Sequence, residues 1–143
     1  MIKTLKIASL LFATMLVFGT SCSKYENGPK LSLRSKKARV TNTWELTEWI
    51  DGSINISENT AGITMTIDKD GSYSIGGENS GGAVESKKGK WEFSSDKTLL
   101  ILTLDGQRAA DKWIITKLKN DELWLEKSQA SNTSGSKKYK GLD

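Results

Sequence analysis

The sequence has one cysteine, Cys22, and no histidine, so few of its side chains can act as nucleophiles or metal ligands. Histidine is the commonest general base near neutral pH and the commonest metal ligand. A single cysteine excludes an intramolecular disulfide and a two-cysteine metal or redox site. No two carboxylates have a spacing that we interpret as catalytic, and a hydroxyl nucleophile would lack a base. We therefore predict a protein that is not an enzyme and that needs no cofactor or metal.

Cys22 follows a segment with the three parts of a secretory signal. Lys3 and Lys6 precede an apolar run over residues 7–18, and small residues occupy positions 19–21. A helix over this apolar run would be roughly 18 Å long, which is too short for a hydrocarbon core of about 30 Å. The small residues followed by Cys22 resemble the lipobox of bacterial lipoproteins. In that group the cysteine becomes the mature N-terminus and its sulfur carries a diacylglyceryl group.

The lipobox resemblance implies a signal peptide over residues 1–21, lipidation with palmitate-type chains at Cys22, and a lipid-anchored protein of the cell envelope, at the outer membrane. Two or more acyl chains anchor a protein stably, since each buried CH₂ contributes about 0.8 kcal/mol. Gly19 stands where the lipobox usually has Leu. Because Gly19 and Ser21 also suit an ordinary signal peptidase, a soluble protein with a free terminal thiol is the alternative.

Charge is unevenly distributed along the mature chain, which has 19 basic and 17 acidic side chains. Residues 22–41 carry a net charge of +5, residues 42–129 carry −5 and residues 130–143 carry +2. We interpret the first range as a basic tether that lies against anionic headgroups or stays solvated, the second as the folded domain, and the third as a polar C-terminal tail in which Lys138-Tyr139-Lys140 could add a last short pairing. The acidic domain has no basic stripe, so we predict no nucleic-acid partner.

The folded domain alternates short runs of β-branched and aromatic residues with turn signals, and no segment keeps a helical period. Asp-Gly pairs and short polar segments between the runs favour hairpins. An open sheet of eight strands would leave two edges bare, and closure removes both. The sequence therefore predicts an all-β fold, an antiparallel up-and-down eight-stranded barrel. The predicted strands cover residues 43–50, 54–57, 63–67, 73–75, 84–93, 98–104, 112–118 and 122–127.

Several motifs within residues 31–127 resemble those of bacterial lipocalin-like lipoproteins. These motifs are Asn42-Thr43-Trp44, Asp70-Gly71-Ser72-Tyr73, Gly89-Lys90-Trp91-Glu92-Phe93, Trp113-Ile114-Ile115 and Leu123-Trp124-Leu125. The resemblance implies a lipocalin-like barrel whose first tryptophan, Trp44, plugs the barrel floor, and a cavity for a small apolar molecule. Lipocalins have Gly-x-Trp at this point, and Asn42 stands in the Gly position.

The side-chain volume available for the barrel interior leaves two alternatives open. Roughly 20 large apolar residues would fill roughly 32 inward places in eight strands, which permits a partly polar cavity. A filled or water-containing barrel is the alternative. For a small hydrophobic or amphipathic ligand, we predict contacts from eight inward-facing residues. They are Trp44, Met65, Tyr73, Ile75, Trp91, Phe93, Leu102 and Trp113.

A non-enzymatic protein-interaction or carbohydrate-binding module is the second hypothesis. It would use loops and an outer aromatic patch, because exposed indoles stack on sugars and on protein partners. Strand alternation places Trp124 on the face opposite Leu123 and Leu125, and an exposed Trp124 beside Trp49 would form such a patch. A barrel that inhibits an enzyme is a variant of this hypothesis.

Overall fold

The computed structural model describes residues 33–79, 81–128 and 134–143, and the predicted signal peptide and Cys22 lie outside these residues. Strands dominate the described chain, and none of its helices is long and apolar enough to cross a membrane. In chain order the elements are α2 (Lys36–Val40), β1 (Asn42–Asp51), β2 (Ile54–Asn55), the 3₁₀ turn η1 (Ser57–Thr60), β3 (Ile63–Ile67), β4 (Ser72–Asn79), β5 (Gly82–Phe93), β6 (Leu99–Leu104), β7 (Asp111–Leu118), β8 (Glu122–Lys127) and β9 (Gly135–Gly141).

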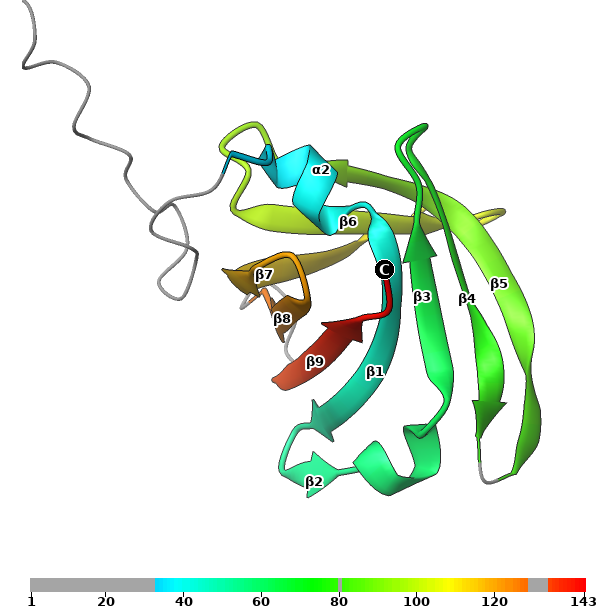
Figure 1. Ribbon diagram of the computed structural model, residues 1–143. Helices are drawn as coiled ribbons and strands as arrows, with labels where there is room; N and C mark the ends of the chain where they lie inside the picture. Colours follow the sequence, from blue (N-terminus) through cyan, green and yellow to red (C-terminus); the bar gives the residue numbers. More distant parts are fainter. Residues whose placement is uncertain (1–32, 80, 129–133) are drawn as a thin grey trace, which may run out of the picture.

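Eight of the strands close into an antiparallel barrel (Figure 1). Each strand from β3 to β9 pairs with the next, and both β3 and β9 pair with β1. The short β2 adds only a two-residue ladder at the end of β1. Closure gives the ladder groups of each strand a partner on both sides, which an open sheet could not do. The predicted all-β, eight-stranded up-and-down barrel is confirmed.

The strand that closes the barrel, β9, lies within the range predicted as a polar tail, residues 130–143. It pairs with β1 from Gly135 to Gly141 and with β8 over most of its length. The predicted strand over residues 54–57 is instead divided between β2 and η1, so β9 supplies the eighth barrel strand. The barrel therefore extends beyond residue 129, where the sequence predicted its end.

A short helix, α2, lies across the end of the barrel at which β1 begins (Figure 1). The Ser35 side chain caps this helix by accepting a hydrogen bond from the backbone N–H of Ala38. Val40 is fully buried, so the helix belongs to the folded domain although its residues fall in the predicted tether. The Trp44 indole N–H donates to the carbonyl of Val40 at 2.8 Å, and Trp44 is itself fully buried. Trp44 thus occupies the plug position that the resemblance implied.

Asn42, in the position where lipocalins have Gly, is buried where the two ends of the described chain meet. Its amide nitrogen donates to the carbonyl of Asn120 at 3.2 Å, and its oxygen accepts from the backbone N–H of Asp143 at 3.2 Å. Both halves of the buried amide are therefore satisfied, which removes the cost of desolvating it. The bonds tie β1 to the β7–β8 turn and to the C-terminus.

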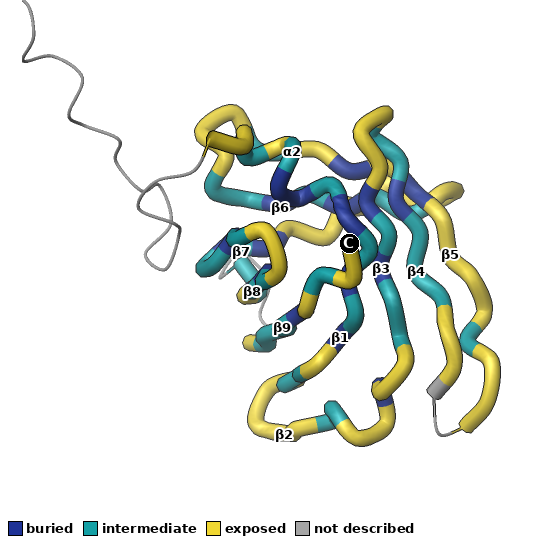
Figure 2. Tube along the Cα trace, in the orientation of Figure 1, coloured by how far each residue is buried: buried dark blue, intermediate teal, exposed yellow. Residues whose placement is uncertain are grey.

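Burial of the inward-facing side chains decreases from the α2 end of the barrel toward the opposite end (Figure 2). On four strands the inward residue nearer α2 is buried and an inward residue farther away is partly exposed. These pairs are Trp44 and Trp49, Ile67 and Ile63, Tyr73 and Ile75, and Leu123 and Lys127. We call the α2 end the closed end. The other end, where β1 and β8 stop at Asp51 and Lys127 and β9 starts at Gly135, is the exposed end.

Candidate functional site

All eight predicted ligand contacts lie on the inward face, but core packing uses most of their surface. Six belong to the buried core, and Ile75 and Phe93 are partly buried against it. Trp44 and Met65 are only 0% and 1% exposed, so these two offer almost no surface to a ligand in this conformation. The rings of Trp91 and Phe93 meet edge to face, with centroids 5.4 Å apart. The role of the eight residues in binding stays a prediction.

A second group of inward-facing side chains lies at the exposed end, and we call it the Trp-Lys cluster. It consists of Trp113 on β7, Lys127 on β8, Lys137 on β9 and Trp49 on β1. The strand registers pair Trp113 with Lys127 and Trp49 with Lys137. Lys137 Nζ lies 4.0 Å from the Trp49 ring centroid and 4.9 Å from that of Trp113, while Lys127 Nζ lies 4.8 Å from Trp113. Two ammonium groups therefore adjoin one indole inside the barrel.

The two lysines of the cluster differ in their carboxylate partners. Lys127 Nζ lies 3.1 Å from Asp111 Oδ1, and that carboxylate is well exposed. Within the described residues, no carboxylate oxygen lies within 4.0 Å of Lys137 Nζ. Burial lowers the pKa of Lys137 to about 8; Asp111 and Asp51 oppose this shift, and Lys127 reinforces it. Lys137 is thus still mostly protonated at neutral pH, in a poorly hydrated position.

A polar group of the inner wall nearer the closed end, Tyr73, also responds to nearby charges. Tyr73 is buried, and its ring covers Gly89, where a Cβ would collide with the ring edge. Burial raises the pKa of Tyr73 to about 12, and the negative charges of Asp111 and Asp105 add to the shift. The Tyr73 hydroxyl is therefore neutral at physiological pH and carries no charge of its own into the interior.

Comparison with known proteins supports the architecture. No protein-family model and no curated protein matches the chain. A lipocalin-like protein from Bacteroides uniformis ATCC 8492 superimposes with a TM-score of 0.58 at 13% identity, covering 73% of this chain and 99% of that chain. The fold is lipocalin-like. An uncharacterized protein from Bacteroides eggerthii DSM 20697 gives a TM-score of 0.57 at 12% identity, covering 71% of this chain and 98% of that chain.

In this lipocalin-like barrel, sequence reasoning missed three of the four cluster residues. Lys137 fell in the predicted tail, Lys127 was the last residue of a predicted strand, and Trp49 was assigned to an outer patch. Simple alternation from Trp44 and Leu46 points Trp49 outward. A β-bulge between Leu46 and Glu48 shifts the register and turns Trp49 inward. No signal in the sequence of β1 marks that bulge.

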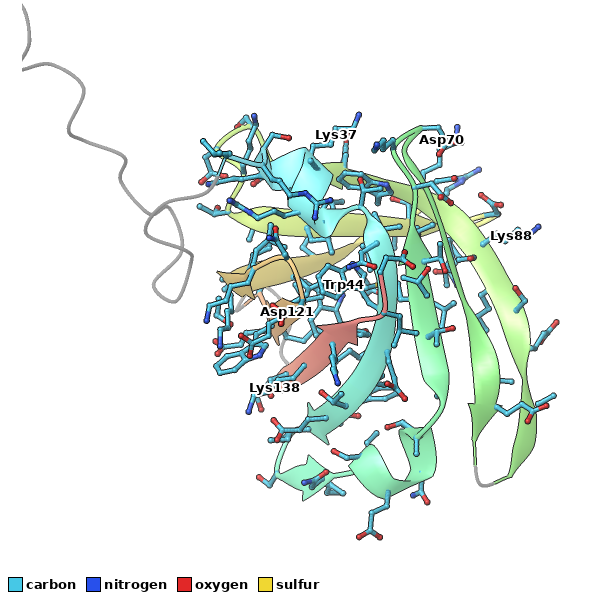
Figure 3. The ribbon with its side chains drawn as sticks, in the orientation of Figure 1. Lys37, Trp44, Asp70, Lys88, Asp121 and Lys138 are labelled. Atoms are coloured by element: carbon cyan, nitrogen blue, oxygen red, sulfur yellow. The ribbon has the colours of Figure 1, made fainter. Side chains whose placement is uncertain are left out.

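The predicted outer patch of Trp49 and Trp124 is wrong, because the two indoles lie on opposite faces of the barrel wall. Trp49 pairs with Lys137, whereas Trp124 pairs with Lys138, the next residue of β9. Neighbouring residues of a strand point to opposite faces. Lys138 and Trp124 therefore lie on the outer face, and the stick view shows Lys138 on β9 away from the plug residue Trp44 (Figure 3).

Lysines cover Trp124 on the outer face, and we call this group the Trp124 cluster. Lys117 Nζ lies 4.0 Å and Lys138 Nζ 4.9 Å from the ring centroid. Both lysines also form ion pairs at 2.9 Å, Lys117 with Glu122 and Lys138 with Glu48. The hydrogen bond from Lys117 lowers the pKa of Glu122 below its usual value. Trp124 is therefore partly exposed rather than a bare stacking platform.

Two open pockets lie away from the Trp-Lys cluster. One, of about 430 Å³, adjoins Trp124 and Lys138. The other, of about 690 Å³, lies between the β3–β4 and β6–β7 turns, where Trp91 is the only predicted contact residue among its lining. Its charged lining mixes Asp70 and Asp105 with Lys90 and Glu92. Among the described residues, no group of three or more Cys, Asp or Glu side chains could hold a metal ion.

Proposed function

We propose that this protein is a lipid-anchored lipocalin-like protein of the cell envelope that binds a small hydrophobic or amphipathic molecule inside its barrel. The supporting observation is the partial exposure of apolar side chains on the inner wall at the exposed end. Trp49, Ile63 and Ile75 are only partly buried against the core. Inward apolar surface that the core leaves uncovered is typical of a ligand site, and the lipocalin-like fold is generally a binding fold.

The ligand is tested on protein purified without denaturant. An organic extract of the purified protein, examined by mass spectrometry, should contain a small amphipathic molecule in stoichiometric amount. A matched extract of the heat-unfolded and washed protein should lack it. An empty extract together with no change in tryptophan fluorescence on addition of alkyl amphiphiles would overturn this part of the proposal.

The anchor is supported by the lipobox-like sequence before Cys22 and by the basic segment that follows it. Intact mass of the protein from a bacterial host should show a diacylglyceryl group and an additional acyl chain at Cys22. The variant Cys22→Ser should lose these masses and leave the membrane fraction. A mature chain with an unmodified thiol would contradict the anchor without bearing on ligand binding.

A further inference from the structure

We propose that the Trp-Lys cluster is the headgroup site for the barrel's ligand, and that the ligand is an amphipathic acid whose carboxylate binds Lys137 and Lys127. The apolar body of the acid would contact Trp49 and Trp113. This inference rests on the proposed interior binding site and adds the sign of the ligand's charge.

The geometry places two cations beside one indole on the inner face of the barrel. Lys127 and Lys137 lie on the adjacent strands β8 and β9, on the same inner face, and their ammonium groups are 4.8 and 4.9 Å from the Trp113 ring centroid. The two like charges repel each other, and Lys127 accordingly contributes to the lowered pKa of Lys137. A carboxylate between them would remove the repulsion and accept a charge-assisted hydrogen bond from each.

Among the described residues, Lys127 has a carboxylate partner and Lys137 has none within 4.0 Å. Asp111 binds Lys127 at 3.1 Å, whereas no carboxylate of the described residues comes within 4.0 Å of Lys137 Nζ. The indole faces of Trp49 and Trp113 compensate for part of the lost hydration through cation–π contacts. A partly buried cation with no ion pair among the described residues is costly to the folded state. The acid headgroup of a ligand would supply the missing partner.

The inner wall also has an apolar surface for the rest of such a molecule. Ile63 and Ile75 are partly exposed, inward-facing and packed against the core. The fully packed closed end around Trp44 limits how far a ligand can enter. The arrangement therefore fits a short molecule with one acidic end and an apolar body.

The outer Trp124 cluster provides a control, because it contains the same residue types and its lysines already have carboxylate partners. Its indole also lies beside two lysines, but Glu122 and Glu48 neutralise them at 2.9 Å. Lys138 follows Lys137 directly in β9 and points to the other face. A variant at position 138 thus changes the same residue type on the same strand without touching the inner wall.

The test compares three ligands that share one tail: decanoate, decanol and decyltrimethylammonium. The mature chain, residues 22–143, is prepared without acyl groups so that no detergent competes, and binding is measured by calorimetry and tryptophan fluorescence. Decanoate should bind about tenfold or more tighter than decanol, because hydrogen bonds to charged groups are the stronger ones, and the cationic amphiphile should bind weakest. The double variant K127M/K137M should bind decanoate no tighter than decanol, while K138M should behave as the unaltered protein.

The outcomes separate the two proposals. Equal binding of decanoate and decanol by the unaltered protein, or a preference that survives in K127M/K137M, would overturn the headgroup site and leave interior binding intact. Failure of all three ligands would overturn both. Circular dichroism and thermal unfolding check that K127M/K137M folds, and unchanged decanol binding by this variant confirms that its interior is intact.

Discussion

Two clusters of this molecule contain the same residue types on opposite faces of one barrel wall. In the Trp-Lys cluster and in the Trp124 cluster, lysine ammonium groups lie 4.0 to 4.9 Å from indole centroids. On the outer face, both lysines have carboxylate partners at 2.9 Å, although Lys117 is only 12% exposed and Lys138 is 39% exposed. On the inner face, Lys137 has neither an ion pair within the described residues nor full hydration. The comparison shows that carboxylate pairing, rather than composition, distinguishes a candidate anion site from an ordinary charged surface.

The largest difference between the clusters should be in the stability that is lost when their tryptophans are replaced by alanine. Trp113 is 5% exposed and part of the core, so Trp113→Ala should lower the free energy of unfolding by about 3–5 kcal/mol. Trp124→Ala on the outer face should cost about 1 kcal/mol. Urea unfolding followed by circular dichroism measures both. Equal losses would contradict the assignment of the two indoles to different faces.

The lysines should change stability with opposite signs. Lys137→Met removes a poorly hydrated cation and should raise the free energy of unfolding at pH 7 by about 1–2 kcal/mol. Lys138→Met removes a partly exposed ion pair with Glu48 and should lower it by about 0.5 kcal/mol. Urea midpoints at unchanged slope give both values. A loss of stability in Lys137→Met would show that its contacts with Trp49 and Trp113 outweigh its desolvation.

The advantage of Lys137→Met should depend on pH. The pKa of Lys137 is about 8 in the folded protein, below the value of 10.5 expected when it is unfolded, with Asp111, Asp51 and Lys127 as the charged groups around it. Between these pH values the unfolded chain binds more protons, so the stability of the unaltered protein rises relative to the variant. The difference should be constant below pH 8 and disappear by about pH 10.5. A constant difference up to pH 10.5 would contradict the lowered pKa.

The smallest predicted effect concerns the ion pair between Lys138 and Glu48 in the Trp124 cluster. Glu48→Gln leaves Lys138 without its 2.9 Å partner and should lower the free energy of unfolding by about 0.5 kcal/mol or less. This loss should vanish in 1 M salt because the pair is partly exposed. Parallel urea titrations at low and high salt measure the difference. A salt-independent loss would indicate a packing role for Glu48 instead.

The sequence was sufficient to predict the barrel but not to identify β9 as the strand that closes it. Alternating apolar residues and Asp-Gly turns marked most of the wall, since each hairpin is a local feature. The closing strand β9 contains one large apolar residue, Tyr139, which is buried and pairs with Leu46 and Leu123. The remaining inward positions of β9 include Lys137, whose burial arises only when β1 and β8 flank it. Lys138-Tyr139-Lys140 suggested at most a short pairing, because the full strand depends on two distant partners that the local pattern does not reveal.

The candidate site was predictable only in part for a related reason. Strand alternation correctly placed Trp113 and the other seven predicted contacts on the inward face, because their strands alternate regularly up to those positions. Trp49 was misplaced because a bulge inserts one residue between it and Leu46. The sequence also did not show the burial gradient, which depends on α2 covering one end. Trp49 and Lys137, which the sequence did not place in the interior, are therefore inward-facing residues at the end opposite Trp44.

The position of α2 has a consequence for how the molecule would stand on a bilayer. The described chain begins at Leu33, next to this helix. A lipid on Cys22 would therefore be attached on the side of the barrel that Trp44 plugs. The intervening segment reaches at most about 40 Å when fully extended. If Cys22 carries the proposed lipid, the proposed ligand site around Trp49 and Lys137 therefore lies at the end of the barrel away from the attached segment.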